Sequence, residues 1–251
     1  MTRENVKIRG ENLTVAYGNN VLMRGVDFEV NKGDVFIVMG GSGCGKSSLM
    51  RVMIGLKEPT KGKLFVDGDD IYAVTDEQRK LIMRNCGILY QSGALFSSMT
   101  LAENIALPLQ QYTDYSPNMI ADLVKLKLAL VGLKGYEDFY PAEISGGMKK
   151  RAGLARALAL DPEILYFDEP SAGLDPVSSK LLDDLILEIN QSLGTTIVII
   201  THELSSIFAI GNNSIYLDMD IKGISARGKP KELLKNPPNE NVFKFLTGGR
   251  K

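Results

Sequence analysis

A glycine-rich segment that directly follows a wholly apolar run constrains the fold of this chain most. Residues 40–47 read Gly-Gly-Ser-Gly-Cys-Gly-Lys-Ser and fit the phosphate-binding pattern G-x-x-x-x-G-K-[ST]. The run Val35–Met39 before it predicts a buried strand, and Ser47–Gly55 predicts a helix. Because glycines let backbone N–H groups approach phosphate oxygens, and a helix N-terminus adds positive potential, this context predicts a phosphate site. The alternative, a glycine-rich turn that binds nothing, leaves the Lys-Ser pair unexplained.

Two side chains at the end of this loop have distinct predicted roles. Lys46 is expected to contact the β- and γ-phosphates of ATP, and the Ser47 hydroxyl is expected to ligate Mg²⁺. The residues of this segment that we expect to bind ATP are Gly40, Gly41, Ser42, Gly43, Cys44, Gly45, Lys46, Ser47 and Ser48.

The rest of the chain alternates between patterns typical of strands and of helices. Val6–Tyr17 and Val26–Val30 contain β-rich stretches, which the turn residues Gly18–Asn20 separate. Leu101–Leu160 has mostly helical spacing. In the last third we expect buried strands at Ile164–Phe167 and Thr195–Ile200, edge strands at Ile215–Leu217 and Gly223–Ala226, a helix at Val177–Leu193 with Leu181, Leu182, Leu185 and Ile189 on one face, and short helices within Lys231–Leu246.

This order of elements predicts an α/β core that carries a helical lobe, in a single domain covering residues 1–251, and the phosphate-binding pattern makes it a fold of the P-loop NTPase type. We expect a mixed sheet flanked by helices, with an N-terminal antiparallel β part. The core would comprise residues 1–90 and 161–230, and an inserted helical subdomain would comprise residues 91–160. Residues 230–251 would form a C-terminal helical tail.

Composition excludes several classes of function. The formal net charge is −1, so the chain does not offer the basic surface that nucleic acid requires. Two cysteines and one histidine are too few for a disulfide framework or a zinc cluster, and they fit a reducing cytosol. The first ten residues lack the apolar region of a signal peptide, and no apolar run is long enough to span a bilayer. We therefore expect any role in a membrane process to require a separate membrane subunit.

Two adjacent carboxylates follow the expected strand Ile164–Phe167. Because ligands bind at the carboxyl ends of parallel strands, Asp168 and Glu169 are expected to face the nucleotide. Asp168 suits the Mg²⁺ shell, and Glu169 suits a general base that orients and deprotonates the attacking water. Asp-Glu-Pro alone would favour a helix N-cap or a surface turn, but the phosphate loop makes the catalytic interpretation stronger.

A serine–glycine segment before these carboxylates carries a family resemblance. Residues 143–148 read Glu-Ile-Ser-Gly-Gly-Met, and the string ISGGMKKRAGLARALALDPEILYFDEPSAGLDP resembles the ABC ATPases from end to end. Ser145, Gly146 and Gly147 begin a predicted helix, so free N–H groups and the helix dipole form a second phosphate site. The resemblance implies a head-to-tail homodimer, in which these residues of one chain contact the γ-phosphate held by the other.

Four further positions match functional positions of the family. Tyr17 resembles the aromatic residue that stacks on adenine, although a tyrosine at the solvent edge of a strand is the alternative. Gln91 resembles the glutamine that reaches Mg²⁺ and the attacking water, and Asp175 lies in a segment that resembles the loop that crosses the dimer interface. A lone histidine is more often structural, but His202 directly follows an expected buried strand and resembles the γ-phosphate histidine. The implied catalytic residues are Glu169, His202 and Gln91, and the implied Mg²⁺ ligands are Ser47, Gln91 and Asp168.

The family pattern is not matched at every position. The family usually has Leu and Gln where this chain has Ile144 and Met148, and many relatives lack Gly173. Because the serine and both glycines are intact, contact with phosphate should survive. Any contact that the glutamine amide makes in relatives has no counterpart here, and Gly173 implies a different geometry at the dimer interface.

Two features of the sequence resemble one subfamily, the ATPase subunits of Mla-type (Mce-associated) phospholipid transporters. They are Gly93 in Gln91–Phe96 and Met148 at the end of the signature. Further similarity lies in Arg24–Val26, Leu130–Leu133 and Val242–Leu246. The resemblance implies a subunit on the cytoplasmic face of the bacterial inner membrane that uses ATP and Mg²⁺ to drive phospholipid transport between inner and outer membranes and so maintains outer-membrane lipid asymmetry. The implied partners are an integral membrane permease, an MCE-domain protein and a small STAS-domain protein.

Three other functions stay open from the sequence. An ABC importer or exporter of an amino acid or another small solute would have the same ATPase motifs. A non-transport ABC ATPase acting on DNA or ribosomes would need a long coiled-coil insertion, or a second cassette with a charged linker, and neither is present. A nucleotide-binding regulator without turnover is disfavoured by Glu169 and His202.

Overall fold

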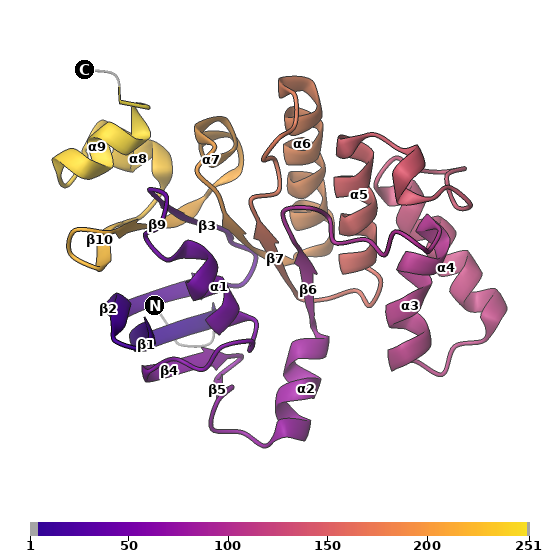
Figure 1. Ribbon diagram of the computed structural model, residues 1–251, viewed down its shortest axis with the longest axis horizontal. Helices are drawn as coiled ribbons and strands as arrows, with labels where there is room; N and C mark the ends of the chain where they lie inside the picture. The colour runs from indigo at the N-terminus through magenta and orange to yellow at the C-terminus, as the bar shows by residue number, and fades with distance from the viewer. Residues whose placement is uncertain (1–4, 250–251) are drawn as a thin grey trace.

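The computed structural model describes residues 5–249, and within this range the strands form two sheets (Figure 1). The strands are β1 (Val6–Tyr17), β2 (Asn20–Asn31), β3 (Val35–Gly40), β4 (Lys61–Val66), β5 (Asp69–Asp70), β6 (Cys86–Leu89), β7 (Ile164–Asp168), β8 (Thr196–Ile200), β9 (Asn213–Asp218) and β10 (Gly223–Arg227). The helices are α1 (Lys46–Met53), α2 (Asp76–Arg84), α3 (Leu101–Tyr112), α4 (Pro117–Leu130), the 3-10 turn η2 (Pro141–Glu143), α5 (Gly146–Ala157), α6 (Pro176–Leu193), α7 (Leu204–Ile210), α8 (Pro230–Lys235) and α9 (Glu240–Leu246).

The central sheet has the order β10-β9-β3-β8-β7-β6. All neighbours are parallel except β10, which is antiparallel to β9. Along β3, Val35, Ile37 and Met39 belong to one apolar core, and Phe36 and Val38 belong to the core on the opposite face. A strand between two cores must be apolar on both sides, which explains why the wholly apolar run correctly predicted it.

The second sheet is antiparallel, with the order β2-β1-β4-β5. Its buried residues, such as Ile8 and Leu13, share a core with Leu49 of α1 and with Phe36 of the central sheet. The helix that follows the phosphate loop is therefore fixed by packing against both sheets.

Helices cover the face of the central sheet that is opposite the antiparallel sheet. Helices α3, α4 and α5 lie together at one end of the molecule, and α8 and α9 lie at the opposite end (Figure 1). Side chains of α3–α5, such as Leu101, Val124 and Leu154, share one apolar core with Ile37 and Phe167 of the sheet. The expected α/β fold with an N-terminal antiparallel part is confirmed, whereas the boundaries of the core, helical subdomain and tail stay a prediction.

Three details differ from the sequence expectations. Strand β9 is not an edge strand, because it pairs with β3 on one side and β10 on the other. On α6, the expected residues Leu182, Leu185 and Ile189 are buried together with Ile186, but Leu181 is 50% exposed and does not belong to the buried face. Helix α2 is not among the expected elements; it has no fully buried residue, although Ile82 and Met83 pack against the core and a capping box at Thr75 marks its start.

Candidate nucleotide-binding and catalytic site

The order of the central strands brings four loops to one edge of the sheet. Strands β3, β8, β7 and β6 are consecutive neighbours and run parallel, so their carboxyl ends meet there. The phosphate loop follows β3, His202 lies two residues after β8, and Gln91 lies two residues after β6. Asp168 ends β7, and Glu169 follows it. This edge therefore gathers most of the polar residues that the sequence pattern singled out.

The glycines of the phosphate loop are required by its backbone. Gly40, Gly43 and Gly45 have φ angles of 153°, 79° and 102°, which side-chain-bearing residues rarely adopt. A Cβ on Gly40 would lie 2.5 Å from the carbonyl oxygen of Leu217, so the loop leaves β3 in close contact with β9. The loop can turn sharply into the first turn of α1 only because these positions lack side chains.

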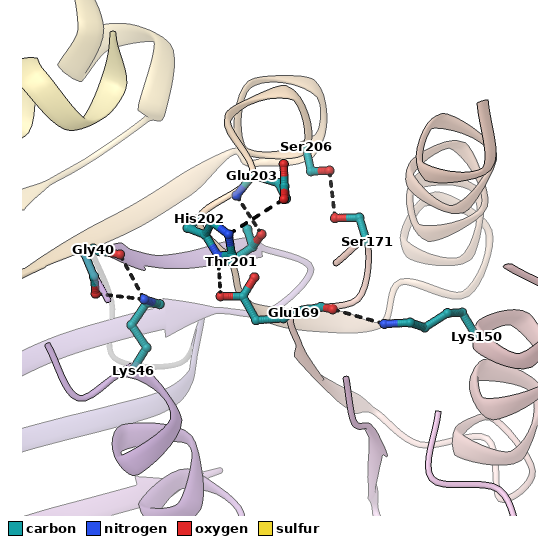
Figure 2. A network of polar contacts seen from close by, with 10 residues as sticks. Gly40, Lys46, Lys150, Glu169, Ser171, Thr201, His202, Glu203 and Ser206 are labelled. Atoms are coloured by element: carbon teal, nitrogen blue, oxygen red, sulfur yellow. Dashed lines mark hydrogen bonds and ion pairs between the residues drawn. The ribbon is translucent and has the colours of Figure 1, made fainter. Parts of the chain in front are cut away.

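The Lys46 ammonium lies over this loop. Lys46 is 9% exposed, and its Nζ donates hydrogen bonds to the carbonyl oxygens of Gly40 at 2.9 Å and Gly41 at 3.0 Å (Figure 2). Ser47 is exposed on the first turn of α1, where its hydroxyl is accessible. Cys44 differs, because it is buried in the core and burial raises the pKa of its thiol. Cys44 therefore contributes backbone rather than side-chain chemistry to the loop.

Tyr17 ends β1 beside α1. Its hydroxyl accepts a hydrogen bond from Arg51 of α1 at 3.5 Å, and the Lys57 ammonium lies 4.2 Å from its ring centroid. Hydrogen bonds from Ser48 and Arg51 lower the pKa of the Tyr17 hydroxyl. The half-exposed ring therefore lies near the helix that carries the phosphate loop, and its stacking role stays a prediction.

Glu169 has a constrained backbone and a partly unpaired carboxylate. Its φ is 48°, and its N–H donates to the carbonyl oxygen of Ile200 on β8 at 2.8 Å. Oε1 lies 2.8 Å from Nδ1 of His202 (Figure 2), while Oε2 is buried and has no hydrogen-bond partner among residues 5–249. An unpaired, buried carboxylate oxygen is costly unless it serves as an acceptor, and an attacking water requires such an acceptor.

Asp168 lies next to Glu169 in a half-buried position. Burial raises the pKa of Asp168, the neighbouring Glu169 raises it further, and the cations Arg51, Lys46 and Lys150 oppose the change. Two adjacent negative charges in a partly desolvated site are stabilised by a divalent cation. No three His, Cys, Asp or Glu side chains cluster as a metal site in the described range, so such an ion would also need hydroxyl, amide and phosphate oxygens.

The remaining predicted residues form a second group. Ser145 caps α5 by accepting from the Met148 N–H at 3.3 Å, and Asp175 caps α6 by accepting from the N–H groups of Val177 and Ser178, both at 3.0 Å. A Cβ on Gly147 would lie 3.3 Å from the Ser178 hydroxyl, so the two helix starts are adjacent.

Ser145 and Asp175 make no side-chain hydrogen bond to the phosphate loop of the same chain within the described residues. In residues 5–249, the side-chain hydrogen bonds of Ser145 and Asp175 are confined to the starts of their own helices. The exposed glycine Gly146 lies at the start of α5, next to Ser145. This arrangement suits a contribution to a site on another chain, which is the role that the sequence predicted.

A buried polar network beside the site was not expected from the sequence. Asp183 on α6 accepts from the Ser206 hydroxyl at 2.9 Å, and Ser206 lies 3.3 Å from the Ser171 hydroxyl (Figure 2 shows the two serines). Burial raises the pKa of Asp183 to about 6, and its Oδ1 has no partner in the described range. Asp183 comes directly after buried Leu182, so a carboxylate on the core face of a helix is the sequence signal that could have revealed it.

Lys150 on α5 is the second unexpected residue. It is 6% exposed, and its Nζ donates to the backbone carbonyl oxygen of Glu169 at 3.3 Å. The sequence signal for the burial of Lys150 is its helical spacing from Gly153 and Leu154, which lie three and four residues later on the same buried face.

Comparison with known proteins decides the family. Residues 23–172 match the model of the ABC transporter family. The chain belongs to the ABC transporter family. The predicted resemblance is therefore confirmed, and nucleotide binding is the general property of this family. None of the helices between residues 5 and 249 combines the length and apolar character that crossing a bilayer requires.

Curated relatives of this ABC transporter chain carry two different names. The Mycobacterium tuberculosis protein mkl, named as a probable ribonucleotide transport ATP-binding protein, is 40% identical over 98% of this chain and 67% of its own length. The Haemophilus influenzae protein MlaF, named as an intermembrane phospholipid transport system ATP-binding protein, is 36% identical over 96% of this chain and 90% of its own length. The Escherichia coli protein of the same name is 36% identical over 92% of this chain and 85% of its own length.

Solved structures of ABC cassettes have the same fold. The dimeric, post-hydrolysis cassette MJ0796, bound to ADP and phosphate, matches with a TM-score of 0.80 and 26% identity over 88% of this chain and 98% of that one. The protein cbiO1 of Clostridium perfringens, part of the ABC transporter complex cbiONQ, matches with a TM-score of 0.85 and 26% identity over 94% of this chain and 93% of that one.

Proposed function

We propose that this chain is the ATP-hydrolysing subunit of an ABC transporter that moves phospholipid between the inner and outer membranes of a bacterium, and so maintains outer-membrane lipid asymmetry. The observation that carries the ATPase assignment is the meeting of the phosphate loop with Asp168, Glu169 and His202 at one sheet edge. The two MlaF relatives, which are named for intermembrane phospholipid transport, support the cargo.

Nucleotide binding would use the Lys46 ammonium, whose hydrogen-bond partners are neutral. Lys46 donates to two backbone carbonyls, which the charged β- and γ-phosphates would replace as stronger acceptors. Mg²⁺, when bound, would neutralise charge on those phosphates. The Ser47 hydroxyl, the Gln91 amide and the Asp168 carboxylate would hold the ion, because all three supply the hard oxygen ligands that Mg²⁺ prefers. The Tyr17 ring would stack on adenine.

Hydrolysis would use the Glu169–His202 pair. Oε1 of Glu169 is paired with His202, so the unpaired Oε2 is the atom that would accept a hydrogen bond, and then a proton, from the attacking water. His202 is 57% exposed, and its second ring nitrogen, Nε2, which lies 3.8 Å from the Glu203 carboxylate, would face the γ-phosphate when nucleotide binds. Gln91 would help to orient the water. Positioning and charge stabilisation would supply most of the rate enhancement.

Two copies of the chain would complete each site. Ser145–Gly147 and Asp175 of one chain would contact the γ-phosphate and nucleotide held by the phosphate loop of the other. The capped start of α5 supplies the N–H groups and positive dipole that a phosphate requires. The dimeric cassette among the similar solved structures supports this arrangement. Hydrolysis would remove the bridging phosphate and let the dimer open.

A groove near Gln91 suits an integral membrane permease. It has a volume of about 630 Å³ and is lined by residues of α2, α3, α5 and the loop after β6. Phe96 and Tyr112 line it and are 50% and 45% exposed, which is high for large aromatic side chains. A helix of the permease would pack into this groove and place the ATPase on the cytoplasmic face of the inner membrane. An MCE-domain protein and a small STAS-domain protein would complete the complex.

The two marker positions of the subfamily, Gly93 and Met148, lie on segments that pack against each other. Gly93 has φ 75°, and a Cβ there would lie 3.0 Å from the carbonyl oxygen of Lys149, directly after Met148. The loop after β6 and the first turn of α5 therefore pack so closely that a side chain at position 93 would crowd the backbone of α5. The name of the mycobacterial relative favours a second cargo, a ribonucleotide, which the same cassette could drive through a different permease.

The test is purification of the chain with its membrane subunits, followed by ATP hydrolysis assays and lipid analysis. We expect Mg²⁺-dependent phosphate release, co-purified phospholipid and a bound STAS-domain protein. Glu169→Gln should leave nucleotide binding intact and reduce turnover about a hundredfold or more. Turnover in Glu169→Gln equal to that of the wild type would refute the role of Glu169. A bound amino-acid permease, or stimulation of ATP hydrolysis by ribonucleotides other than ATP, would refute the phospholipid cargo.

A further inference from the structure

The buried cation Lys150 has no role in the hydrolytic scheme above. Its ammonium has three donors, yet across the described range it makes a single hydrogen bond, to the Glu169 carbonyl oxygen at 3.3 Å (Figure 2). A lysine that is 6% exposed usually has a carboxylate partner. Burial lowers the pKa of Lys150, and the nearby carboxylates Glu169 and Asp168 oppose that change. The cation therefore interacts with the catalytic segment through one backbone bond and through its charge.

This bond acts at a constrained point of the backbone. Glu169 has φ 48°, a conformation that costs a side-chain-bearing residue about 1 kcal/mol or more. Ile200 accepts from the N–H of Glu169 at 2.8 Å, and Lys150 donates to its carbonyl oxygen. Contacts on both sides therefore hold this residue and aim its side chain at His202 (Figure 2). One of the two contacts comes from α5 and not from the sheet.

The same helix carries the signature residues. Helix α5 begins at Gly146, and Lys150 follows four residues later, about 6 Å along the axis. Further along, Arg156 donates to the carbonyl oxygens of Ala94 at 2.8 Å and Gly93 at 3.3 Å, so α5 is also hydrogen-bonded to the loop that carries Gln91. A displacement at the start of this helix therefore reaches both the catalytic segment and the Gln91 loop.

We propose that Lys150 is a positioning residue that couples the two ATP sites of the dimer. The proposal rests on the head-to-tail dimer described under the proposed function. There, Ser145–Gly147 of one chain act in one composite site, while Glu169 of that same chain acts in the other. When the signature residues engage a γ-phosphate, the Lys150–Glu169 bond transmits the displacement of α5 to the base of the second site. Because the bond is to the backbone, the Glu169 carboxylate stays free for catalysis.

The first experiment compares three variants in the purified transporter complex. Lys150→Met removes the ammonium but keeps the apolar stem, and Lys150→Arg keeps a cation. Lys149→Met is the matched control, because the side chain of the neighbouring Lys149 makes no hydrogen bond or ion pair within residues 5–249. We expect Lys150→Met to lower kcat about tenfold and to bring the Hill coefficient for ATP close to one, with affinity for a fluorescent ATP analogue nearly unchanged. Lys150→Arg should restore most of both quantities, and Lys149→Met should match the wild type.

The second experiment uses mixed dimers that carry one copy each of Lys150→Met and Glu169→Gln. With both changes in the same chain, the intact Glu169 belongs to the chain with intact Lys150, and activity should equal that of a dimer with Glu169→Gln alone. With the changes in opposite chains, the only intact Glu169 lacks its lysine, and activity should fall about tenfold further. This difference depends on placement, so a general loss of stability in the Lys150→Met chain cannot produce it.

Several results would overturn the proposal. They are a Lys150→Met complex with wild-type kcat and Hill coefficient, failure of Lys150→Arg to restore activity, or equal activity in the two mixed dimers. The proposal would also be overturned if the dimer with both changes in one chain were the less active of the two. Lys150 would then act on the site that the signature residues of its own chain contact, and not on the Glu169 of its own chain. If the wild-type complex itself does not hydrolyse ATP, the proposed function fails instead.

Discussion

Replacing Asp183 with Asn tests whether a buried charge lies beside the catalytic loops. The Asp183 carboxyl has one hydrogen-bond donor, Ser206, and burial raises its pKa from 3.8 to about 6. A shift of about two units corresponds to about 3 kcal/mol. Because the raised pKa means that the folded state binds this proton more tightly, stability falls as the pH rises from about 4 to 6, and the full cost persists above pH 6. The amide oxygen that Asp183→Asn introduces would still accept from Ser206.

The assay is urea unfolding of wild type and variant at pH 5, 6 and 7.5. We expect Asp183→Asn to raise the free energy of unfolding at pH 7.5 by up to about 3 kcal/mol, and the difference should shrink as the pH falls toward 4. Asp184→Asn is the control, because Asp184 is exposed and pairs with Lys180 on the surface at 3.0 Å, so its removal should change stability by less than about 1 kcal/mol. A difference that is independent of pH, or a less stable Asp183→Asn at pH 7.5, would refute the reasoning.

Three further substitutions test the loops around the site. Gly93→Ala places a Cβ 3.0 Å from the Lys149 carbonyl oxygen in a residue with φ 75°, so we expect a loss of about 1–2 kcal/mol in unfolding free energy and reduced ATPase activity. Asn104 is fully buried and bonds to both backbone groups of Phe96, so Asn104→Ala should cost about 3 kcal/mol in the same unfolding assay. Tyr17→Ala should weaken ATP binding about tenfold in a fluorescence titration, and an unchanged affinity would favour a purely structural tyrosine.

The sequence predicted best what depends on local pattern. The apolar runs of β3, β7 and β8 required burial on both faces, and the phosphate-loop pattern required a strand before it and a helix after it. Strand β9 was assigned wrongly to an edge because strand order depends on long-range pairing that the local pattern does not encode. Helix α2 was not predicted because it contains no fully buried residue, and only a short side of it, at Ile82 and Met83, packs against the core.

The candidate site could be predicted only in part for a similar reason. Residues in known motifs, such as Glu169 and His202, could be named in advance, and the structure brings them within 2.8 Å of each other. The burial of Lys150 and Asp183 has a signal in their helical spacing, but their roles could not be named in advance, because each acts through a partner on a distant segment, Glu169 in one case and Ser206 in the other. Their partners became visible only when the packing of α5, α6 and α7 was known.

The central claim is that ATP hydrolysis at Glu169 drives phospholipid movement, and reconstituted transfer tests it most directly. The purified complex would be placed in vesicles with isotope-labelled phospholipid, and transfer to or from acceptor vesicles would be followed with and without Mg²⁺-ATP. We predict ATP-dependent transfer in either direction by the wild type, and transfer at the level without ATP for Glu169→Gln, which still binds the nucleotide. Transfer that is the same with and without ATP, or that survives in Glu169→Gln, would contradict the account.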